Sequence, residues 1–363
     1  MDYIWPLSFI CEVYSYVHFG LYHFICSGKD GLYAIGKTFW VSKYLTQIYL
    51  SRNNNIGNEG IICLVVAATE HASSDAVVFP SLEILNLSDC NIGPLGMQTL
   101  AEMLLRDNRC KRIDIGLSAN PIGSEGCQTL SKLIAIPGRG SIISRLNLSQ
   151  CAVGDEGVTL LSNAATSNSC IGLTFLDLSE NSITCDGARI LARSLTDSWP
   201  SLIELKLAKN NLGNDGVTLL MNSIHTNNTL QHLDLICTGC GKEGAIAALN
   251  NSGCLTTLRL FNNRLGSDGF HAISSCLRGG HASIENLDLG GNNADEDSVI
   301  ELLNNIADNG DSDVKSKLSV LEIGGNTFGA KAMEALTKLK QVFPHLDVAH
   351  DKPIDTAEEE LSD

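Results

Sequence analysis

The sequence is short of positive charge. Its 363 residues include 25 Lys and Arg against 41 Asp and Glu, which gives a formal net charge of −16 at pH 7. A protein that binds nucleic acid as its main partner needs a basic stripe that contacts the phosphates. The composition therefore argues against nucleic acid and favours a basic or mixed-charge protein as the partner.

The motifs of the common enzyme classes are also missing. The sequence contains no H-E-x-x-H, no G-x-S-x-G, no P-loop and no dinucleotide-binding fingerprint. Its nine His never fall at metal-ligand spacing. We therefore expect a protein without enzymatic activity, without a metal and without a cofactor.

The 13 Cys are scattered along the chain and do not form a disulfide pattern. Free Cys such as Cys90 and Cys151 pack like small apolar residues, and reduced thiols fit a cytoplasmic protein, with the nucleus as the alternative. Cys237 and Cys240 form a lone C-x-x-C. Without a second pair, this motif is a weak sign of a metal or redox site.

One frame repeats along most of the chain: L-x-x-L-x-L-x-x-N/C-x-L-x-x-x-G-x-x-x-L. Residues 202–220 fit this frame without a gap, and the other copies are partly degraded. Ten units result, most of them 28 to 31 residues apart, and their second apolar positions are residues 48, 85, 115, 146, 176, 205, 233, 258, 287 and 321. Such regular self-similarity is typical of a repeat architecture.

The frame predicts a strand, a turn and a short helix in each unit. Leucines at period two belong to a strand, and a single unit buries them only by stacking on its neighbours. An Asn in the turn can donate and accept hydrogen bonds for two adjacent turns, and Cys90, Cys151 and Thr238 are weaker substitutes. We therefore predict an α/β fold over residues 41–343: a right-handed solenoid with parallel strands on the concave face and helices on the convex face.

The pattern in residues 176–191 and 205–220 resembles the ribonuclease-inhibitor type of leucine-rich repeat. This subfamily includes ribonuclease inhibitors, the repeat domains of NOD-like receptors and the Ran GTPase-activating proteins. The resemblance covers about residues 45–340 and implies a horseshoe. It is specific for the fold and says little about function, because such repeats serve many unrelated functions.

Both ends of the chain differ from the repeats. Residues 1–40 are aromatic and apolar, and residues 4–26 contain no Lys or Arg. Three interpretations stay open: a cap on the first repeat, a membrane anchor that leaves the repeats in the cytoplasm, or a start that is not part of the natural mature chain. Residues 344–363 read as an acidic, solvated tail.

The function is expected to come from the concave face. Residues that flank the buried leucines point outward from it, and in the sixth to eighth units Lys and Arg gather near a Phe and an Ile, with acids around them. Aromatic and Arg side chains dominate many protein-binding surfaces. The expected protein-binding residues are Lys206, Lys209, His232, Ile236, Arg259, Phe261, Arg264, Asp177, Asp234 and Asp288. The alternative is that Phe261 packs on a neighbouring strand and the charges are solvated.

Two functions follow. The first is a non-enzymatic scaffold that binds a partner protein, one with a small acidic patch inside a basic surround, on the concave face. The second comes from the resemblance to Ran GTPase-activating proteins: activation of a small GTPase, with Arg52 as the positioned cation. Arg52 lies in the turn "LSRNNNIG". The long loop that carries the family's Arg has no clear counterpart here, and the acidic tail is short.

Overall fold

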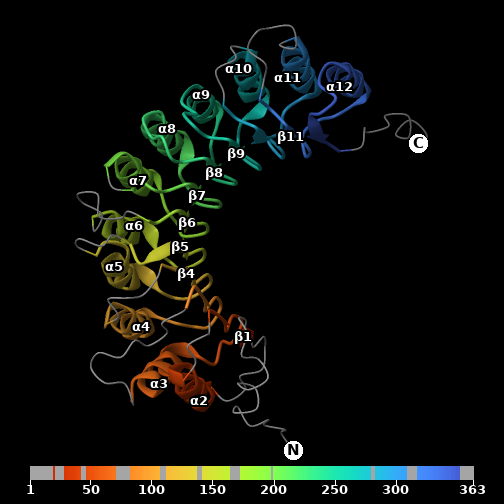
Figure 1. Cartoon of the computed structure of the whole chain (residues 1–363). Coiled ribbons are helices and arrows are strands. Elements are labelled where there is room, and N and C mark those ends of the chain that lie inside the picture. Colours follow the sequence, from red (N-terminus) through yellow and green to blue (C-terminus); the bar gives the residue numbers. More distant parts are fainter. Residues whose placement is uncertain are drawn as a thin grey trace, which may run out of the picture. The chain divides into compact units, whose positions relative to one another are not determined.

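A computed structural model describes residues 19–20, 28–41, 46–70, 82–106, 112–136, 141–163, 172–197, 199–278, 283–308 and 317–351. They belong to two compact units. Unit 1 comprises residues 1–182 and 197–202, and unit 2 comprises residues 183–196 and 203–363. In both units short strands alternate with helices, as Figure 1 shows.

The described part of unit 1 contains six strands and five helices. They are β1 (Phe19–Gly20), α2 (Gly28–Val41), β2 (Gln47–Tyr49), α3 (Gly57–Thr69), β3 (Ile84–Asn86), α4 (Pro94–Arg106), β4 (Ile113–Gly116), α5 (Gly123–Ile134), β5 (Ile143–Asn147), α6 (Gly154–Asn163) and β6 (Phe175–Asp177).

The described part of unit 2 follows the same order, starting from a helix. Its elements are α7 (Cys185–Asp197), β7 (Glu204–Lys206), α8 (Gly213–Ile224), β8 (His232–Asp234), α9 (Lys242–Asn250), β9 (Thr257–Arg259), α10 (Gly266–Arg278), β10 (Asn286–Asp288), α11 (Glu296–Asp308), β11 (Val320–Glu322), α12 (Ala330–Val342) and β12 (Asp347–Ala349).

Within each unit the strands pair in parallel and in sequence order. In unit 1 the aligned central residues are Ile48, Leu85, Ile115, Leu146 and Leu176. In unit 2 they are Leu205, Leu233, Leu258, Leu287 and Leu321. These are the second apolar positions of the ten predicted repeats. The predicted leucine-rich-repeat fold, with parallel strands on one side and helices on the other, is confirmed in each unit.

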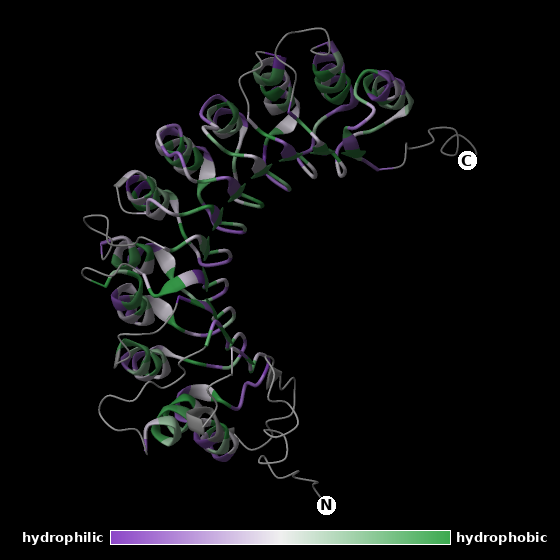
Figure 2. Ribbon diagram, in the orientation of Figure 1, coloured by the Kyte–Doolittle hydropathy of each residue, from purple (hydrophilic) through white to green (hydrophobic). Residues whose placement is uncertain are grey.

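The core of each unit lies between the strands and the helices. In the repeat that starts at β7, Leu205, Leu207 and Leu212 are buried, and so are Val217 and Leu220 of α8. Figure 2 shows hydrophilic residues in the turns that follow the strands. Each repeat therefore buries its leucines against its own helix and against its neighbours, as a solenoid requires.

A row of buried Asn side chains holds the turns together. Asn263 donates from Nδ2 to the carbonyls of Leu235 (2.8 Å) and Leu260 (3.0 Å), and its Oδ1 accepts from the amides of Thr238 (2.9 Å) and Cys240 (3.0 Å). One amide thus serves two adjacent turns, as the sequence predicts. The thiol substitute is weaker: Cys90 donates from Sγ to the carbonyl of Leu50 at 3.0 Å and lacks the amide acceptor.

The strands continue beyond the ten predicted repeats at both ends. β1 pairs with β2, and α2 packs on α3, where a Cβ on Gly36 would lie 2.4 Å from the Leu64 carbonyl oxygen. At the other end β12 pairs with β11, in the range that the sequence assigns to the tail. Residues 352–363 of that tail lie outside the described residues.

No helix in the described ranges is long and apolar enough to cross a bilayer. The segment that the sequence offers as an anchor, residues 4–26, lies almost wholly outside those ranges.

Candidate functional site

The side of the unit 2 sheet that lies away from the helices, called the strand face below, is built from strands of three residues. The central Leu of each strand points into the core: Leu205, Leu233, Leu258 and Leu287 are at most 1 % exposed. Side chains alternate along a strand, so the residues before and after each Leu lie on the strand face. Two columns of outward side chains result.

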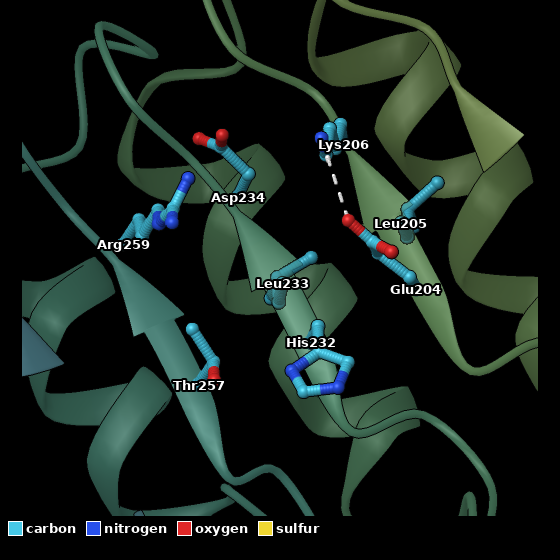
Figure 3. Close-up of a pocket in the computed structure, with 8 residues that line it drawn as sticks. All are labelled: Glu204, Leu205, Lys206, His232, Leu233, Asp234, Thr257 and Arg259. Atoms are coloured by element: carbon cyan, nitrogen blue, oxygen red, sulfur yellow. Dashed lines mark ion pairs between the residues drawn. The ribbon is translucent and has the colours of Figure 1, made fainter. Parts of the chain in front are cut away.

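A shallow hollow of about 250 Å³ lies on this face across β7, β8 and β9. We call it the His232 hollow, and Figure 3 shows its lining: Glu204, Leu205, Lys206, His232, Leu233, Asp234, Thr257 and Arg259. Four of the residues that the sequence singles out, Lys206, His232, Asp234 and Arg259, therefore come together here.

The two cations of the His232 hollow each have an acidic neighbour. Lys206 Nζ lies 3.4 Å from Glu204 Oε1 on the same strand. In Figure 3 the Arg259 side chain points toward Asp234 on the adjacent strand. The basic centre expected from the sequence is therefore a mixed-charge surface.

A second hollow of about 220 Å³ lies beside the first, across β9, β10 and β11. We call it the Asp288 hollow. It is lined by Thr257, Arg259, Asn286, Leu287, Asp288, Val320 and Glu322. Arg259 and Thr257 line both hollows, so the two form one continuous feature of the strand face with Arg259 between them.

Asp288 is the most buried acid of this surface, with 9 % of its surface exposed. Its Oδ1 accepts a hydrogen bond from the amide of Gly290 at 3.0 Å. Burial raises the pKa of Asp288 to about 6, against the smaller opposing effects of the Gly290 amide and of Arg259. Glu322 and Asp234 raise this pKa further through charge repulsion.

The acids singled out by the sequence also have a structural role that the sequence analysis missed. Asp177, Asp234 and Asp288 each accept a hydrogen bond on Oδ1 from the amide two residues ahead, at 2.9 to 3.0 Å. Asn86 and Asn147 make the same bond in their repeats. This Asx turn fixes the bend after the strand, so one oxygen of each carboxylate is engaged in the fold.

Phe261 lies in the turn after β9 and is 41 % exposed. Its ring rests against the next turn, because a Cβ on Gly290 would be 2.7 Å from the ring. Phe261 thus packs on a neighbouring repeat, as the alternative expects, while part of its side chain stays exposed; its role in binding stays a prediction. Ile236, in the preceding turn, is partly buried.

Five of the expected binding residues line neither hollow: Phe261 and Ile236, described above, and Lys209, Arg264 and Asp177. Lys209 is exposed in the turn after β7, and its amide donates to the Ile236 carbonyl at 2.7 Å. Arg264 is exposed beyond the buried Asn263, and its amide donates to the Cys240 carbonyl. Asp177 belongs to unit 1.

Conversely, the hollows contain residues that the sequence analysis overlooked, namely Glu204, Thr257 and Asn286. They occupy the position just before the central Leu of each strand. The signal was present, because residues two apart on a strand share a face, and His232, which the sequence does single out, holds the same position in β8.

Arg52, the cation proposed for GTPase activation, is exposed in the turn after β2, and its amide donates to the Ser88 carbonyl at 2.9 Å. Its backbone is left-handed, with φ of +62°. The equivalent residue has a positive φ in all ten repeats: Arg52, Asp89, Ala119, Gln150, Glu180, Lys209, Cys237, Asn262, Gly291 and Gly325. This conformation is therefore a property of the repeat and does not mark Arg52 as a strained functional residue.

The lone C-x-x-C has the environment of packed thiols. Cys240 is buried, and desolvation raises its pKa to about 12, which disfavours the reactive thiolate. Cys237 is partly buried, with Asn262 Nδ2 at 3.1 Å from its sulfur. Within the described ranges, no group of three or more His, Cys, Asp or Glu is placed to hold a metal ion.

Known proteins with similar repeats match this chain over most of its length. A Leucine Rich repeat family model matches residues 41–65, 80–101, 143–162 and 200–221. Over 234 residues the chain is 31 % identical to NACHT, LRR and PYD domains-containing protein 14 of Mus musculus, covering 62 % of this chain and 23 % of that protein. Over 318 residues it is 26 % identical to NACHT, LRR and PYD domains-containing protein 5 of Mus musculus, covering 84 % and 26 %.

The ribonuclease inhibitor of Mus musculus is 28 % identical over 234 residues, which is 62 % of this chain and 50 % of the inhibitor. The chain thus spans about a quarter of the length of the two NACHT proteins and half of the inhibitor. With its repeat register and Asn row, this chain is a leucine-rich-repeat protein of the ribonuclease-inhibitor-like type, whose repeats are similar to those of the NACHT, LRR and PYD domains-containing proteins.

Proposed function

We propose that this chain is a non-enzymatic scaffold that binds a partner protein on the strand face of unit 2, over the His232 and Asp288 hollows. The observation that carries the proposal is the pair of adjoining hollows that share Arg259, with side chains of both charges and the exposed Phe261 beside them. A mixed surface of this kind suits a protein partner, because aromatic and Arg anchors supply energy and charge pairs set partner choice.

The strands fix the points at which these side chains leave the backbone. Lys206, Asp234 and Arg259 stand in register on neighbouring strands, and the central Leu of each strand fixes it to the core. A partner that docks on such a surface loses little free energy to ordering it. Rigid presentation of side chains at fixed intervals is then the mechanism of binding.

The similar proteins support a binding function in general terms. One of them is by its name an inhibitor of a ribonuclease, hence a protein that acts on another protein. We also propose a cytoplasmic location, because the nine cysteines of the described residues are all free thiols, as in a reducing compartment.

The test is partner capture with the full chain and with a triple variant, Lys206→Ala, Arg259→Ala and Phe261→Ala. The matched control replaces exposed helix residues of similar type: Lys132→Ala, Arg193→Ala and Leu95→Ala. We expect the strand-face variant to lose a partner that the control retains, with the thermal unfolding of both near that of the wild type. A partner retained by the strand-face variant would contradict the proposal.

Activation of a small GTPase through Arg52 stays a prediction from the resemblance. Its test is direct: Arg52→Ala should abolish stimulated GTP hydrolysis if the chain has that activity. Because the conformation of Arg52 is shared by all ten repeats, we put the scaffold forward in its place.

A further inference from the structure

We propose that the Asp288 hollow receives an arginine or lysine side chain of the partner protein. This inference rests on the proposed function and names the chemistry of the partner at one point of the surface. It reverses the polarity expected from the sequence, which placed a small acidic patch of the partner opposite a basic centre.

The two hollows differ in charge. Lys206 has Glu204 as its partner, and Arg259 points toward Asp234, so the His232 hollow is balanced within itself. The Asp288 hollow has two carboxylates, those of Asp288 and Glu322, against the single shared cation Arg259. No ion pair between described residues engages either carboxylate at a distance of 4 Å or less, so negative charge is left over in this hollow.

The uncompensated charge in the Asp288 hollow is also buried. Asp288 is 9 % exposed, and Leu287 and Val320 form apolar walls of the same hollow. A carboxylate in such a place has lost most of its hydration, and the Gly290 amide replaces only part of it. The raised pKa of Asp288 reflects this imbalance. A cation from the partner would restore the missing favourable interaction. An ion pair with Asp288 should therefore contribute more binding free energy than a solvent-exposed ion pair.

The size of the Asp288 hollow fits one side chain. A volume of about 220 Å³ is below the usual range for a drug-sized ligand and suits a single side chain. Beside the hollow the turn after β10 is closely packed, because a Cβ on Gly290 would lie 2.7 Å from the Phe261 ring and 2.9 Å from the Gly324 carbonyl oxygen. The ring of Phe261 rests on Gly290, two residues after Asp288, and lies beside the hollow without lining it.

Arginine fits this combination better than lysine. Its planar guanidinium can bind a carboxylate through two N–H groups and can stack on an aromatic ring, whereas lysine offers a compact charge. A further carboxylate, that of Asp351, accepts a hydrogen bond from the Gly325 amide at the neighbouring turn and extends the acidic surround.

The binding should weaken in mild acid. The charged groups that face Asp288 are Glu322 from β11, Arg259 from β9 and Asp234 from β8. Because the pKa of Asp288 is about 6, protonation between pH 7 and pH 5 removes most of its charge. We expect affinity for a cationic side chain to fall by up to about tenfold over this interval.

The test uses a blocked pentapeptide, acetyl-Gly-Gly-Arg-Gly-Gly-amide, and its citrulline analogue, which has nearly the same shape without the charge. Both are titrated into the full chain with labelled methyl groups, and the methyl signals of Leu287 and Val320 are followed by NMR, since both residues line the hollow. We expect saturable shifts with the arginine peptide and at least fivefold weaker ones with citrulline. Equal shifts with both peptides would overturn the proposal.

Two variants complete the design. Asp288→Asn keeps the acceptor for Gly290 and removes the charge, and it should weaken the arginine peptide about tenfold. Asp177→Asn is the matched control: Asp177 is 8 % exposed, makes the same turn bond at 2.9 Å and lies in unit 1. The control should bind like the wild type. If both variants weaken the peptide equally, the attraction is to the overall negative charge and the hollow is not the receptor.

The two proposals can fail separately. If a captured partner is lost with the Lys206, Arg259 and Phe261 triple variant but binds Asp288→Asn as well as the wild type, the scaffold stands and the cation receptor is wrong. If no partner depends on the triple variant, while the arginine peptide still binds at Asp288, the scaffold proposal fails on its own experiment.

Discussion

At the scale of the residue, Asp288 and Asn263 show how this fold uses buried polar groups differently. Asn263 is neutral, and its amide is fully used by neighbouring turns. Asp288 carries a charge that one backbone amide only partly compensates. The first therefore stabilises the repeat, whereas the second lowers the stability of the folded chain at pH 7, which we attribute to the proposed binding role of Asp288.

The burial of this partly compensated carboxylate gives a prediction for Asp288. Its pKa in the folded chain, about 6, lies above the ordinary value of 3.8, so the folded state binds the proton more tightly. Its contribution to the free energy of unfolding should rise as pH falls from about 6 to about 4, and it should be unfavourable at pH 7. We expect Asp288→Asn to stabilise the chain by about 1 kcal/mol at pH 7 and by little at pH 4.5.

Urea unfolding of the wild type and of Asp288→Asn at the two pH values measures this difference, because the other carboxylates titrate equally in both proteins. If the difference in free energy of unfolding between the two proteins is the same at both pH values, the pKa of Asp288 in the folded chain is near the ordinary value.

A second prediction concerns Asn263. Asn263→Ala leaves the carbonyls of Leu235 and Leu260 and the amides of Thr238 and Cys240 without this partner in a buried place. Unsatisfied buried groups cost about 1 to 3 kcal/mol each, so we expect a loss of at least about 3 kcal/mol in chemical denaturation. Asn250→Ala on the exposed end of α9 is the control and should change the stability by less than about 0.5 kcal/mol.

At the scale of the element, α2 is tied to α3 by close packing and by polar contacts. A Cβ on Gly36 would lie 2.4 Å from the Leu64 carbonyl oxygen and 2.8 Å from the Ala67 Cβ, so only Gly allows this approach. Tyr33 donates from its hydroxyl to the Glu70 carboxylate at 2.7 Å. These contacts make α2 part of the packed helices of unit 1.

Gly36→Leu should therefore separate the two helices. We expect the free energy of unfolding to fall by about 2 kcal/mol or more, in the upper part of the range for overpacked cores, even though Leu is a better helix former than Gly. Hydrogen exchange should rise in α2 and α3 first. Lys29→Ala, on the exposed first turn of the same helix, should leave exchange in α3 unchanged; comparable exchange in both variants would show that Gly36 is not a packing position.

The elements also show what a sequence can and cannot reveal here. The central leucines of the strands were predictable, since Leu205, Leu233, Leu258 and Leu287 repeat in a frame that only a solenoid buries. The helix α2 and the strand β12 carry no such frame, because an end element packs on one neighbour only. The pairing of Glu204 with Lys206 was missed for another reason: two residues on one strand face are close in space yet look independent in the pattern.

The candidate site was predictable in position and not in charge balance. The sequence marked Lys206, His232, Asp234 and Arg259, which the structure brings into one hollow. It gave no sign that Asp288 is nine-tenths buried, because burial of a side chain at the strand end depends on its neighbours across the sheet. The binding role of these residues stays a proposal that the experiments above test.

At the scale of the whole molecule, the thiols offer a measure of folding. Nine cysteines are free within the described residues, and four of them, Cys90, Cys127, Cys151 and Cys240, are buried with pKa values raised to about 11 or 12 by desolvation. We expect these four to resist alkylation at pH 8 in the native chain and to react together once it unfolds. Cys185 and Cys254, which are partly exposed, should react first.

Peptide mapping after timed iodoacetamide treatment follows each thiol separately. Alkylation of Cys240 as fast as that of Cys185 under native conditions would contradict the burial described for the turn of β8. The same mapping can be repeated over a series of denaturant concentrations. If the unit 1 thiols Cys90, Cys127 and Cys151 become reactive at a different concentration from Cys240, the two units unfold separately.

The left-handed turn residue of each repeat has a consequence for how such a molecule changes over generations. Ten positions share one backbone conformation while carrying an acid, a base, an amide, a thiol, a methyl group or no side chain at all. The turn is thus set by its buried surroundings, and the identity of this residue is nearly free. Substitutions can therefore change the exposed side chains of the turns one repeat at a time. The surface available for binding can diverge quickly while the fold stays the same.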